Sequence, residues 1–266
     1  MKSYVLKNSK FIFHTIGEGY PIIFIAGLGA DYSIWDKIFP LIKNFQLIFF
    51  DNRGAGDNKN YAAPDTIEKM ALDVIKIIKQ LELNDVCLIG HSLGSYVAQH
   101  TASVIPDQIG ALMLISSRKK TSINTMLHYQ VIAELIAAGV SRKTLIKDSL
   151  SWLYSSHFLN NNKTIEEIIK TILTKTPAVP LKNYYKQVKA ATRHNAETIL
   201  KKIKSPTVIF QGDEDILCKK QEAMALSSSI KNSQFIVIDN AAHMIPIENP
   251  HSLAQHINNI LNNSRK

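Results

Sequence analysis

The sequence predicts an α/β fold in which a mostly parallel central sheet is flanked by helices and interrupted once by an all-helical segment. Short apolar runs alternate with amphipathic helical stretches over residues 1–116 and again over residues 206–266. Such continuous apolar runs are typical of strands that are covered on both faces. Residues 117–205, between these two regions, contain no convincing strand. A helical block inserted between the strands of one sheet is expected to form a lid on the core rather than a second domain in series.

The strands are identified by short runs of β-branched and aromatic residues. Pro21-Ile22-Ile23-Phe24-Ile25 leads into Gly27, and the run 45–50 leads into Asp51. The runs over residues 4–6 and 11–16 are close enough in sequence to pair as a hairpin. Strands are expected over residues 4–6, 11–16, 21–25, 45–50, 85–89, 111–115, 206–211 and 234–239.

Helices are expected where apolar residues recur every three or four positions, as they do over residues 67–81. The core helices are expected over residues 31–42, 67–81, 93–104 and 219–229, with a final one after Glu248-Asn249-Pro250. The lid helices are expected near 123–138, 141–155, 164–174 and 181–202, with breaks at Gly139, Asn160-Asn161-Asn162, Pro177 and Pro180.

Composition excludes several classes of protein. The chain has 266 residues, of which 45% are hydrophobic and 20% charged, unlike a disordered, collagenous or coiled-coil sequence. Its two cysteines, Cys87 and Cys218, cannot build a disulfide framework. No apolar run reaches the length of a signal peptide or the ~18 residues of a membrane span. We therefore expect a cytoplasmic protein with no integral membrane segment.

The positive charge of the chain is concentrated in the predicted lid. The formal net charge is +9, and Lys outnumbers Arg 26 to 5. Residues 117–205 hold 16 Lys and Arg against 5 Asp and Glu, a net charge of +11, whereas the rest of the chain nets −2. A general drift toward lysine would spread the charge evenly. The uneven distribution indicates that the lid steers an anionic partner.

The sequence Gly90-His91-Ser92-Leu93-Gly94 lies between a predicted strand and a predicted helix. A Gly-x-Ser-x-Gly motif in that context forms a sharp turn that holds the serine in a strained backbone conformation above the sheet. The two glycines are required because the helix packs back onto the strand. The helix N-terminus also favours developing negative charge. Ser92 is therefore the candidate nucleophile.

A nucleophilic serine needs a base, and the base needs an orienting carboxylate. Of the nine histidines, His243 alone follows the serine in the chain and also lies at a predicted strand end. The carboxyl ends of strands line the crevice of open α/β sheets, so His243 is the expected base. The others are expected to be solvated or to fill the core.

Three carboxylates compete for the orienting role, because Asp213, Glu214 and Asp215 follow the strand that ends at Gly212. We choose Asp215, and we expect Asp213 and Glu214 to shape the turn or face solvent. Asp239, at the end of the last strand, is a further alternative.

An oxyanion hole requires two N–H donors aimed at the reacting carbonyl oxygen. One is expected from Leu93, directly after the nucleophile, and the other from Leu28 in the loop Ala26-Gly27-Leu28-Gly29. On its own, this loop could equally be an ordinary glycine-containing turn.

These motifs together resemble the α/β-hydrolase superfamily, and in particular its lidded serine esterase branch. In that family the acid usually falls three residues after the glycine, which supports Asp215. The chain departs from the family pattern at Ala26, Asn58 and Ser95, none of which removes a catalytic atom. The matching segments are Ala26-Gly27-Leu28-Gly29 with Trp35 downstream, Asp51-Asn52-Arg53-Gly54-Ala55-Gly56, Gly90-His91-Ser92-Leu93-Gly94, Gly212-Asp213-Glu214-Asp215, and Ala242-His243 followed by Glu248-Asn249-Pro250.

The resemblance narrows the reaction. Haloalkane dehalogenases and epoxide hydrolases of this family carry Asp at the elbow, so Ser92 argues against both. Carbon–carbon bond hydrolases usually carry a Ser-Gly-x-Gly-Pro type loop that this chain lacks. Cleavage of a carboxylic ester is our interpretation; thioesterase, lactonase and perhydrolase activities, and a non-enzymatic ligand receptor, remain as alternatives. No metal and no cofactor is expected, because no ligand spacing, phosphate loop or dinucleotide fingerprint is present.

The lid and the loops next to the triad are expected to bind the substrate. Substrate contacts are predicted for Gly27, Trp35, Met126, Trp152 and Met244, and partner contacts for the lid residues Arg118, Lys119, Lys120, Arg142 and Lys143.

The expected partner of the basic lid is anionic. Candidates are an acidic acyl carrier protein, an anionic lipid surface or an ester that itself carries a carboxylate. The methyl esterases of biotin synthesis, which act on a pimeloyl chain held on carrier protein, resemble the chain in size, lid and triad. Nucleic acid is not expected, because the lid lacks interleaved aromatic residues and any known binding motif. A monomer or weak dimer is expected.

Overall fold

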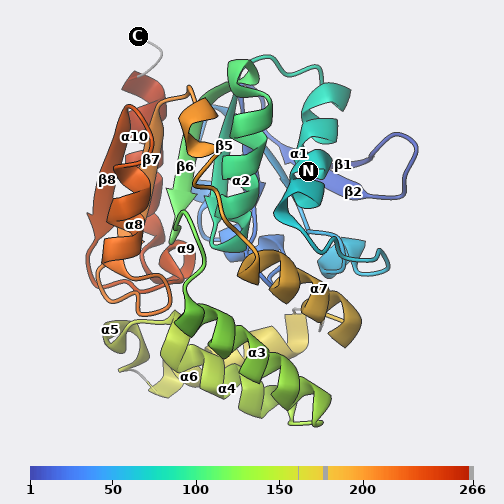
Figure 1. The fold of residues 1–266 in the computed structure, drawn as a ribbon, viewed down its shortest axis with the longest axis vertical. Helices are drawn as coiled ribbons and strands as arrows, with labels where there is room; N and C mark the ends of the chain where they lie inside the picture. Colours follow the sequence, from blue (N-terminus) through green and yellow to red (C-terminus); the bar gives the residue numbers. More distant parts are fainter. Residues whose placement is uncertain (161, 176–178, 264–266) are drawn as a thin grey trace.

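The computed structural model describes residues 1–160, 162–175 and 179–263, which fold around one eight-stranded sheet (Figure 1). The strand order is β1-β2-β4-β3-β5-β6-β7-β8. Strands β1 and β2 form the predicted antiparallel hairpin, β2 pairs antiparallel with β4, and the remaining neighbours are parallel. The strands are β1 (Lys2–Val5), β2 (Ile12–Ile16), β3 (Tyr20–Ile25), β4 (Phe45–Phe50), β5 (Val86–His91), β6 (Ile109–Ile115), β7 (Thr207–Gly212) and β8 (Ser233–Ile238).

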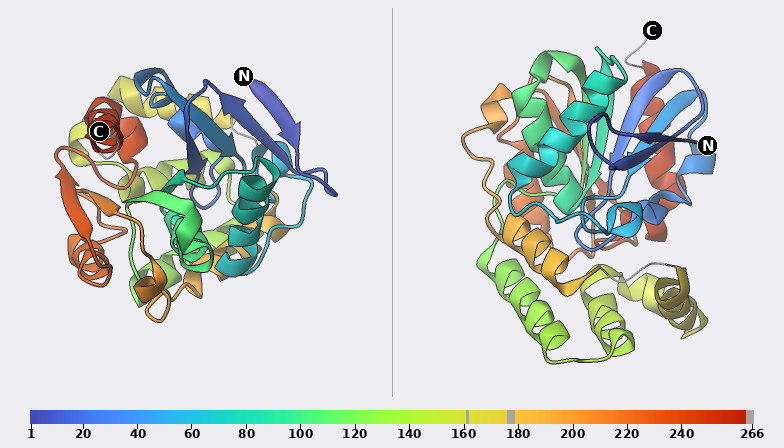
Figure 2. Two further views of the ribbon diagram at one scale, coloured as in Figure 1. Left: turned by 90° about the horizontal axis from the view of Figure 1, so that it is seen from above. Right: turned by 90° about the vertical axis from the view of Figure 1, so that its right-hand side faces the viewer.

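Helices cover both faces of the sheet, as the apolar strands predict (Figure 2). Along β3, Ile23 and Ile25 belong to one hydrophobic cluster, whereas Ile22 and Phe24 belong to the other. This alternation is the period of two residues expected of a strand. Helices α1 (Ile67–Gln80), α2 (Leu93–Val104) and α8 (Lys220–Ser227) cover the first face; the 3₁₀ helix η1 (Tyr32–Trp35) and helix α10 (Pro250–Asn263) cover the second.

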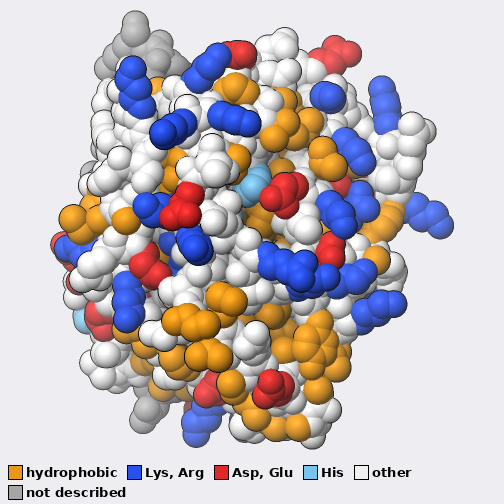
Figure 3. Space-filling model, viewed as in Figure 1, with side chains coloured by type: hydrophobic (Ala, Val, Ile, Leu, Met, Phe, Trp, Pro, Cys, Tyr) orange, Lys and Arg blue, Asp and Glu red, His pale blue; other side chains and the backbone are white. Residues whose placement is uncertain are grey.

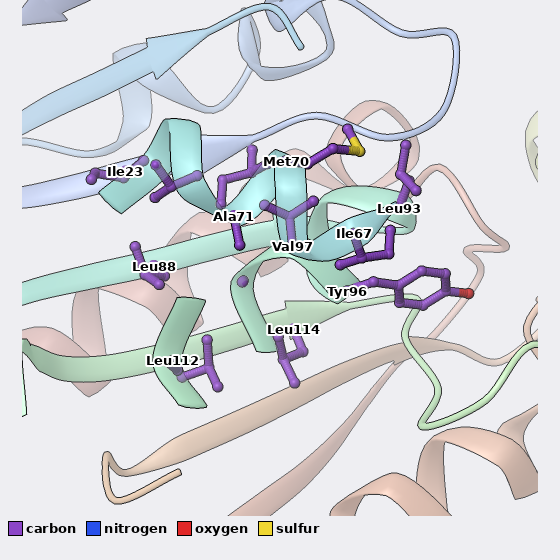
Figure 4. Packing of buried hydrophobic residues seen from close by; sticks show 14 of the residues in the cluster. Ile23, Ile67, Met70, Ala71, Leu88, Leu93, Tyr96, Val97, Leu112 and Leu114 are labelled. Carbon is purple, nitrogen blue, oxygen red and sulfur yellow. The ribbon is translucent and has the colours of Figure 1, made fainter. Parts of the chain in front are cut away.

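The packing of α1 and α2 fixes the helix that follows the candidate nucleophile. Met70 and Ala71 of α1 and Val97 of α2 meet over the sheet residues Leu88 and Leu112 (Figure 4). Each of these side chains is at most 3% exposed. The N-terminus of α2 is therefore held firmly against β5, where Ser92 lies.

Residues 117–205, which we term the lid, connect β6 to β7; their helices up to Thr192 lie together beyond the carboxyl ends of the parallel strands, and the turn Leu200–Lys202 lies against α2 (Figures 1 and 2). Among its described residues the only β-structure is an isolated bridge between Lys120 and Asn195. The lid helices are α3 (Ile123–Ala137), α4 (Arg142–Leu153), α5 (Ser156–Leu159), α6 (Asn162–Lys175) and α7 (Leu181–Thr192), followed by the 3₁₀ helix η5 (Leu200–Lys202).

Two predicted helices are wrong in extent. The helix expected over 31–42 is two 3₁₀ turns, η1 and η2 (Phe39–Leu41), because Asp31 caps a short turn at Ser33 and Pro40 starts the second turn. The helix expected over 181–202 ends at Thr192, because the residues after it turn back toward the start of the lid, where the Ala196 N–H donates to the Lys119 carbonyl.

Other differences are small. Helix α5 was not expected as a separate element; the Ser155 side chain caps it. The predicted breaks at Asn161 and Pro177 lie outside the described residues. Within the described residues, no helix is both long enough and apolar enough to cross a membrane.

Candidate active site

Ser92 lies on the turn between β5 and α2 with φ 52° and ψ −118°. This left-handed conformation costs a non-glycine residue free energy and is a feature of functional turns. A Cβ at Gly90 would lie 2.4 Å from the Gly94 carbonyl oxygen, and a Cβ at Gly94 would lie 2.1 Å from the Ile25 carbonyl oxygen. The prediction that both flanking positions must lack a side chain is therefore confirmed.

The loops after β7 and β8 bring Asp215 and His243 together. His243 Nδ1 lies 2.9 Å from Asp215 Oδ2, and both residues are buried. The second carboxylate oxygen, Oδ1, accepts the N–H groups of Leu217 at 3.0 Å and Cys218 at 2.8 Å. These backbone donors hold the carboxylate in one orientation. An ionised Asp215 in turn selects the tautomer in which His243 Nδ1 carries the proton and Nε2 is free to act as a base.

The other carboxylates that the sequence offered do not bind His243. Asp213 is exposed and accepts the Ala241 N–H at 3.2 Å, and Glu214 accepts the Ser156 N–H at 2.8 Å. Asp239 is exposed. Asp213 and Glu214 thus shape the loops, in the way expected for them.

The His243 loop is held from several sides. The His243 carbonyl accepts hydrogen bonds from His91 Nε2 at 2.8 Å and from Ser116 Oγ at 3.0 Å. Glu248 Oε1 accepts the N–H groups of the two residues that flank His243, at 3.0 and 3.1 Å. Sequence reasoning gave no role to Glu248; its signal is a single acidic residue five positions after the histidine.

Glu248 also joins this loop to the lid. Its Oε2 accepts the Ser155 N–H at 2.8 Å, and the Met244 N–H reaches the Leu153 carbonyl at 3.1 Å. Burial raises the pKa of the Glu248 carboxyl, while the hydrogen bonds from Ser155, Ala242 and Met244 oppose that rise. The segment between α4 and α5 is therefore bonded directly to the candidate base's loop.

His91 is a neutral partner of His243 rather than a second base. Burial, together with the nearby His243, lowers the pKa of His91 to about 3. Its ring lies 5.1 Å from the His243 ring, and its Nε2 must carry the proton because it donates to a carbonyl. His91 therefore supports the loop without exchanging protons near neutral pH.

The loop that carries Leu28 lies against Ser92, and Leu93 follows Ser92 directly in the chain. A Cβ at Gly27 would lie 3.3 Å from the Ser92 Cβ, which puts the loop after β3 against the nucleophile. The ends of this loop are fixed: Asn52 Nδ2 donates to the Ala26 carbonyl at 3.0 Å, and the Gly29 N–H donates to Gln187 in α7 at 2.9 Å. In the part of the chain that the structure describes, neither the Leu28 nor the Leu93 N–H has an intramolecular acceptor.

A lid residue also reaches the nucleophile. Tyr129 of α3 is buried and hydrogen-bonds to the Ser92 side chain. Burial raises the pKa of Tyr129 to about 12, although nearby Arg118 and the Ser92 hydrogen bond oppose the rise, so the phenol stays protonated at neutral pH. No hydrogen bond between Ser92 and His243 is present among the described residues. Catalytic hydrogen bonds are often long before substrate binds.

The residues predicted to contact substrate lie in different environments. Met244 is buried directly after His243, whereas Met126 of α3 and Trp152 of α4 are half-buried, and Trp152 packs 4.2 Å from the His128 ring. Trp35 is fully buried in the core, where its ring meets Phe24 edge-on at 5.2 Å.

The residues predicted to contact a partner differ in how exposed they are. Lys120 and Lys143 are exposed, and Lys119 and Arg142 are half-exposed. The prediction that Arg118 faces a partner is wrong, because only 1% of this residue is exposed. Its guanidinium points inward and donates to the Leu217 carbonyl and to Thr125.

Among the described residues, no three His, Cys, Asp or Glu side chains gather in a way that could hold a metal ion. The arrangement brings together a strained serine, a histidine ordered by a carboxylate, and the loop after β3 against the serine.

Comparison with known proteins is consistent with this geometry. Residues 20–250 match the family model described as alpha/beta hydrolase fold. A thermophilic esterase from Thermogutta terrifontis is 25% identical, with a TM-score of 0.86 and complete coverage of both chains. The enol-lactonase of Burkholderia xenovorans LB400 is 17% identical, with a TM-score of 0.82 over 98% of this chain and 100% of the other.

A sequence relative from Rhizobium rhizogenes, provisionally named carbamate hydrolase RutD, is 26% identical over 236 residues, covering 86% of this chain and 87% of its own. The chain belongs to the α/β-hydrolase fold family and is a hydrolase.

Proposed function

We propose that the chain is a serine hydrolase that cleaves a carboxylic ester through an acyl-enzyme. The observation that carries this proposal is the buried 2.9 Å hydrogen bond between His243 and Asp215, formed on loops at the strand ends beside the strained Ser92 turn. Ser92 is the nucleophile, His243 the base and Asp215 the orienting acid. The N–H groups of Leu28 and Leu93 form the oxyanion hole.

The reaction proceeds in two halves. Ser92 Oγ attacks the ester carbonyl while His243 Nε2 takes its proton, and the carbonyl oxygen becomes an oxyanion between the two N–H donors. His243 then returns the proton to the leaving alcohol, and the acyl group stays on Ser92. Water, activated by the same histidine, releases the acid. Asp215 keeps Nδ1 protonated and stabilises the imidazolium throughout.

The relatives support an ester but leave the leaving group open. The esterase of Thermogutta terrifontis, at 25% identity and with complete coverage of both chains, favours ester cleavage. Thioesterase, lactonase and perhydrolase reactions use the same serine, histidine and acid, and remain alternatives to the ester.

A substrate panel tests the proposal. We expect the wild type to hydrolyse p-nitrophenyl esters of at least one acyl length, and Ser92→Ala to abolish this activity. Ser103→Ala is a matched control on the same helix, because that hydroxyl donates to the His100 carbonyl at 2.8 Å within the helix itself. Equal rates for wild type and Ser92→Ala at every acyl length would overturn the proposal. CoA thioesters and lactones in the same panel identify the leaving group.

The charged lid supports a finer proposal about how the acyl group arrives. Lys182, Lys189 and Arg193 are exposed along α7, and Lys186 is half-exposed beside them. Lys and Arg side chains gather on this face of the molecule (Figure 3). A surface of this kind attracts acidic macromolecules over distances of about a Debye length. We propose that the substrate is presented on an acidic carrier protein.

Charge reversal tests the carrier proposal without touching the buried Arg118. The variant Lys182→Glu, Lys186→Glu, Arg193→Glu should lower kcat/KM on an acyl-carrier ester by about tenfold or more, with steep salt dependence, and leave a neutral p-nitrophenyl ester unchanged. Reversing the exposed Lys7 and Lys10 of the β1–β2 hairpin is the control. Equal losses on both substrates would contradict the carrier proposal.

A further inference from the structure

Arg118 is a buried cation at the root of the lid. It follows β6, and only 1% of the residue is exposed. Burying a guanidinium is costly unless its N–H groups are bound and its charge is offset. What surrounds this side chain therefore indicates what it stabilises.

The guanidinium joins three elements. Nη1 donates to Thr125 Oγ1 at 2.7 Å and to Ser122 Oγ at 3.1 Å, both at the start of α3, and approaches Glu222 Oε1 of α8 at 3.3 Å. Nη2 donates to the carbonyl of Leu217, in the loop that carries Asp215. Glu222 is 24% exposed in its side chain and also accepts the Lys219 N–H, so it offsets the Arg118 charge only in part.

The Leu217 carbonyl and the Cys218 N–H belong to one peptide group. Arg118 binds the oxygen of this peptide, and Asp215 Oδ1 accepts its N–H at 2.8 Å. The peptide dipole therefore lies between a cation at its negative end and a carboxylate at its positive end. Both contacts are favourable, and each polarises the peptide in the direction that strengthens the other.

We propose that Arg118 is a positioning residue for the Asp215–His243 pair and acts through the peptide group between Leu217 and Cys218. It fixes the loop so that Asp215 Oδ2 meets His243 Nδ1. Because it also anchors the first turn of α3, it sets the lid root and the acid loop in one arrangement. This inference rests on the proposed triad.

The first test is kinetic. Arg118→Met should lower kcat on a p-nitrophenyl ester about tenfold to a hundredfold, the effect expected at Asp215 from losing the charge-assisted hydrogen bond to the Leu217 carbonyl, with KM changed less than about threefold. Arg118→Lys keeps the positive charge but lacks the forked guanidinium, so its kcat should lie between those of the wild type and Arg118→Met. Arg53→Met is the matched control, because Arg53 also makes charge-assisted hydrogen bonds, to Asp73 at 2.7 and 2.8 Å.

A double-mutant cycle separates positioning from general destabilisation. If Arg118 acts through Asp215, Arg118→Met should lower kcat less than about threefold when Asp215→Asn is already present. An equal factor in both backgrounds would overturn the proposal, as would wild-type kcat for Arg118→Met. If Arg118→Met does not fold, the cycle uses Thr125→Val, which removes the second donor to the Leu217 carbonyl, at 3.1 Å, and keeps the charge; additive effects there overturn it equally.

A readout independent of turnover distinguishes this inference from the proposed function. The His243 Nδ1 proton bonded to Asp215 should give a downfield proton resonance, which Arg118→Met shifts or broadens and Arg53→Met leaves in place. An unchanged resonance in Arg118→Met overturns the inference even if the wild type hydrolyses esters. If instead wild type and Ser92→Ala are equally inactive while the resonance responds, the proposed function fails and the positioning role stands.

Discussion

Replacing Gly94 by Ala tests how the oxyanion hole is built. The added Cβ would lie 2.1 Å from the Ile25 carbonyl oxygen and 2.7 Å from that of Ala26, both backbone atoms of β3 and the loop after it. Ordinary contact begins at about 3.4 Å, so α2 and β3 must separate by more than an ångström. Overpacking of this kind costs about 1–3 kcal/mol.

The same movement separates the two candidate donors, because Leu93 precedes Gly94 and Leu28 follows Ala26. Misplacement by ~1 Å, or loss of one oxyanion donor, lowers kcat by about 10²-fold or more. We therefore expect Gly94→Ala to lower kcat on a p-nitrophenyl ester about a hundredfold. At ~2–4 °C per kcal/mol, its Tm should fall by about 2–12 °C.

Gly139→Ala is the control for glycine substitution in general. Gly139 has φ +78°, but a Cβ at this position would meet no atom within 4 Å. It should lose about 1–2 kcal/mol of stability from backbone strain and keep its kcat. Steady-state kinetics and calorimetry on both variants measure the difference. If Gly94→Ala kept the kcat and Tm of the wild type, Gly94 would not be what allows α2 to lie so close to β3 and the loop after it.

Three further predictions concern the acid, the histidine loop and pH. Asp215→Asn should lower kcat by about 10⁴-fold, because it selects the wrong imidazole tautomer, and Asp213→Asn by less than about threefold; the opposite ranking in steady-state kinetics would move the acid to Asp213. Glu248→Gln should lower kcat about tenfold with KM nearly unchanged, since the amide cannot accept all three N–H groups; unchanged kcat contradicts this. Burial lowers the pKa of both His91 and His194 to about 3, so the unfolded chain binds protons that the folded chain does not as pH falls below about 6.5. The contribution of these histidines to the free energy of unfolding should therefore be fully present above about pH 6.5 and should decline toward pH 3, by up to ~1.4 kcal/mol per pH unit for each histidine. Urea unfolding at pH 7 and pH 5 checks this. If His194→Asn did not reduce the change in unfolding free energy between the two pH values, the prediction would be contradicted.

The sequence predicted the elements whose signals are local. Helix α2 has the predicted bounds, Leu93–Val104, and β4 the predicted Phe45–Phe50, because apolar spacing and flanking turns both mark their ends. The region 31–42 was predicted as one helix because its apolar residues recur at helical spacing. Pro40 and the Asp31 cap instead favour two 3₁₀ turns, in which Trp35 still reaches the core.

The candidate site likewise contains residues that the sequence could identify and residues that it could not. Strand order limited the acid to a few carboxylates, the resemblance to the family supported Asp215 among them, and the hydrogen bond of Asp215 to His243 is present. Glu248 and Arg118 could not, because their roles depend on contacts between distant parts of the chain: Arg118 meets Leu217 across 99 positions. Arginine is usually exposed, so a basic run at 118–120 was interpreted as surface. Its burial follows from a peptide carbonyl that only the folded chain presents.

We propose Ser92 as the nucleophile and His243 as the base that activates it. Incubation with a fluorophosphonate, followed by mass spectrometry of the intact protein and of its peptides, tests this claim most directly. We predict one phosphonyl group per chain, on the peptide that contains Ser92, with labelling lost in Ser92→Ala and slowed in His243→Ala. Absence of an adduct on the wild type, or an adduct that persists undiminished in Ser92→Ala, would contradict the assignment.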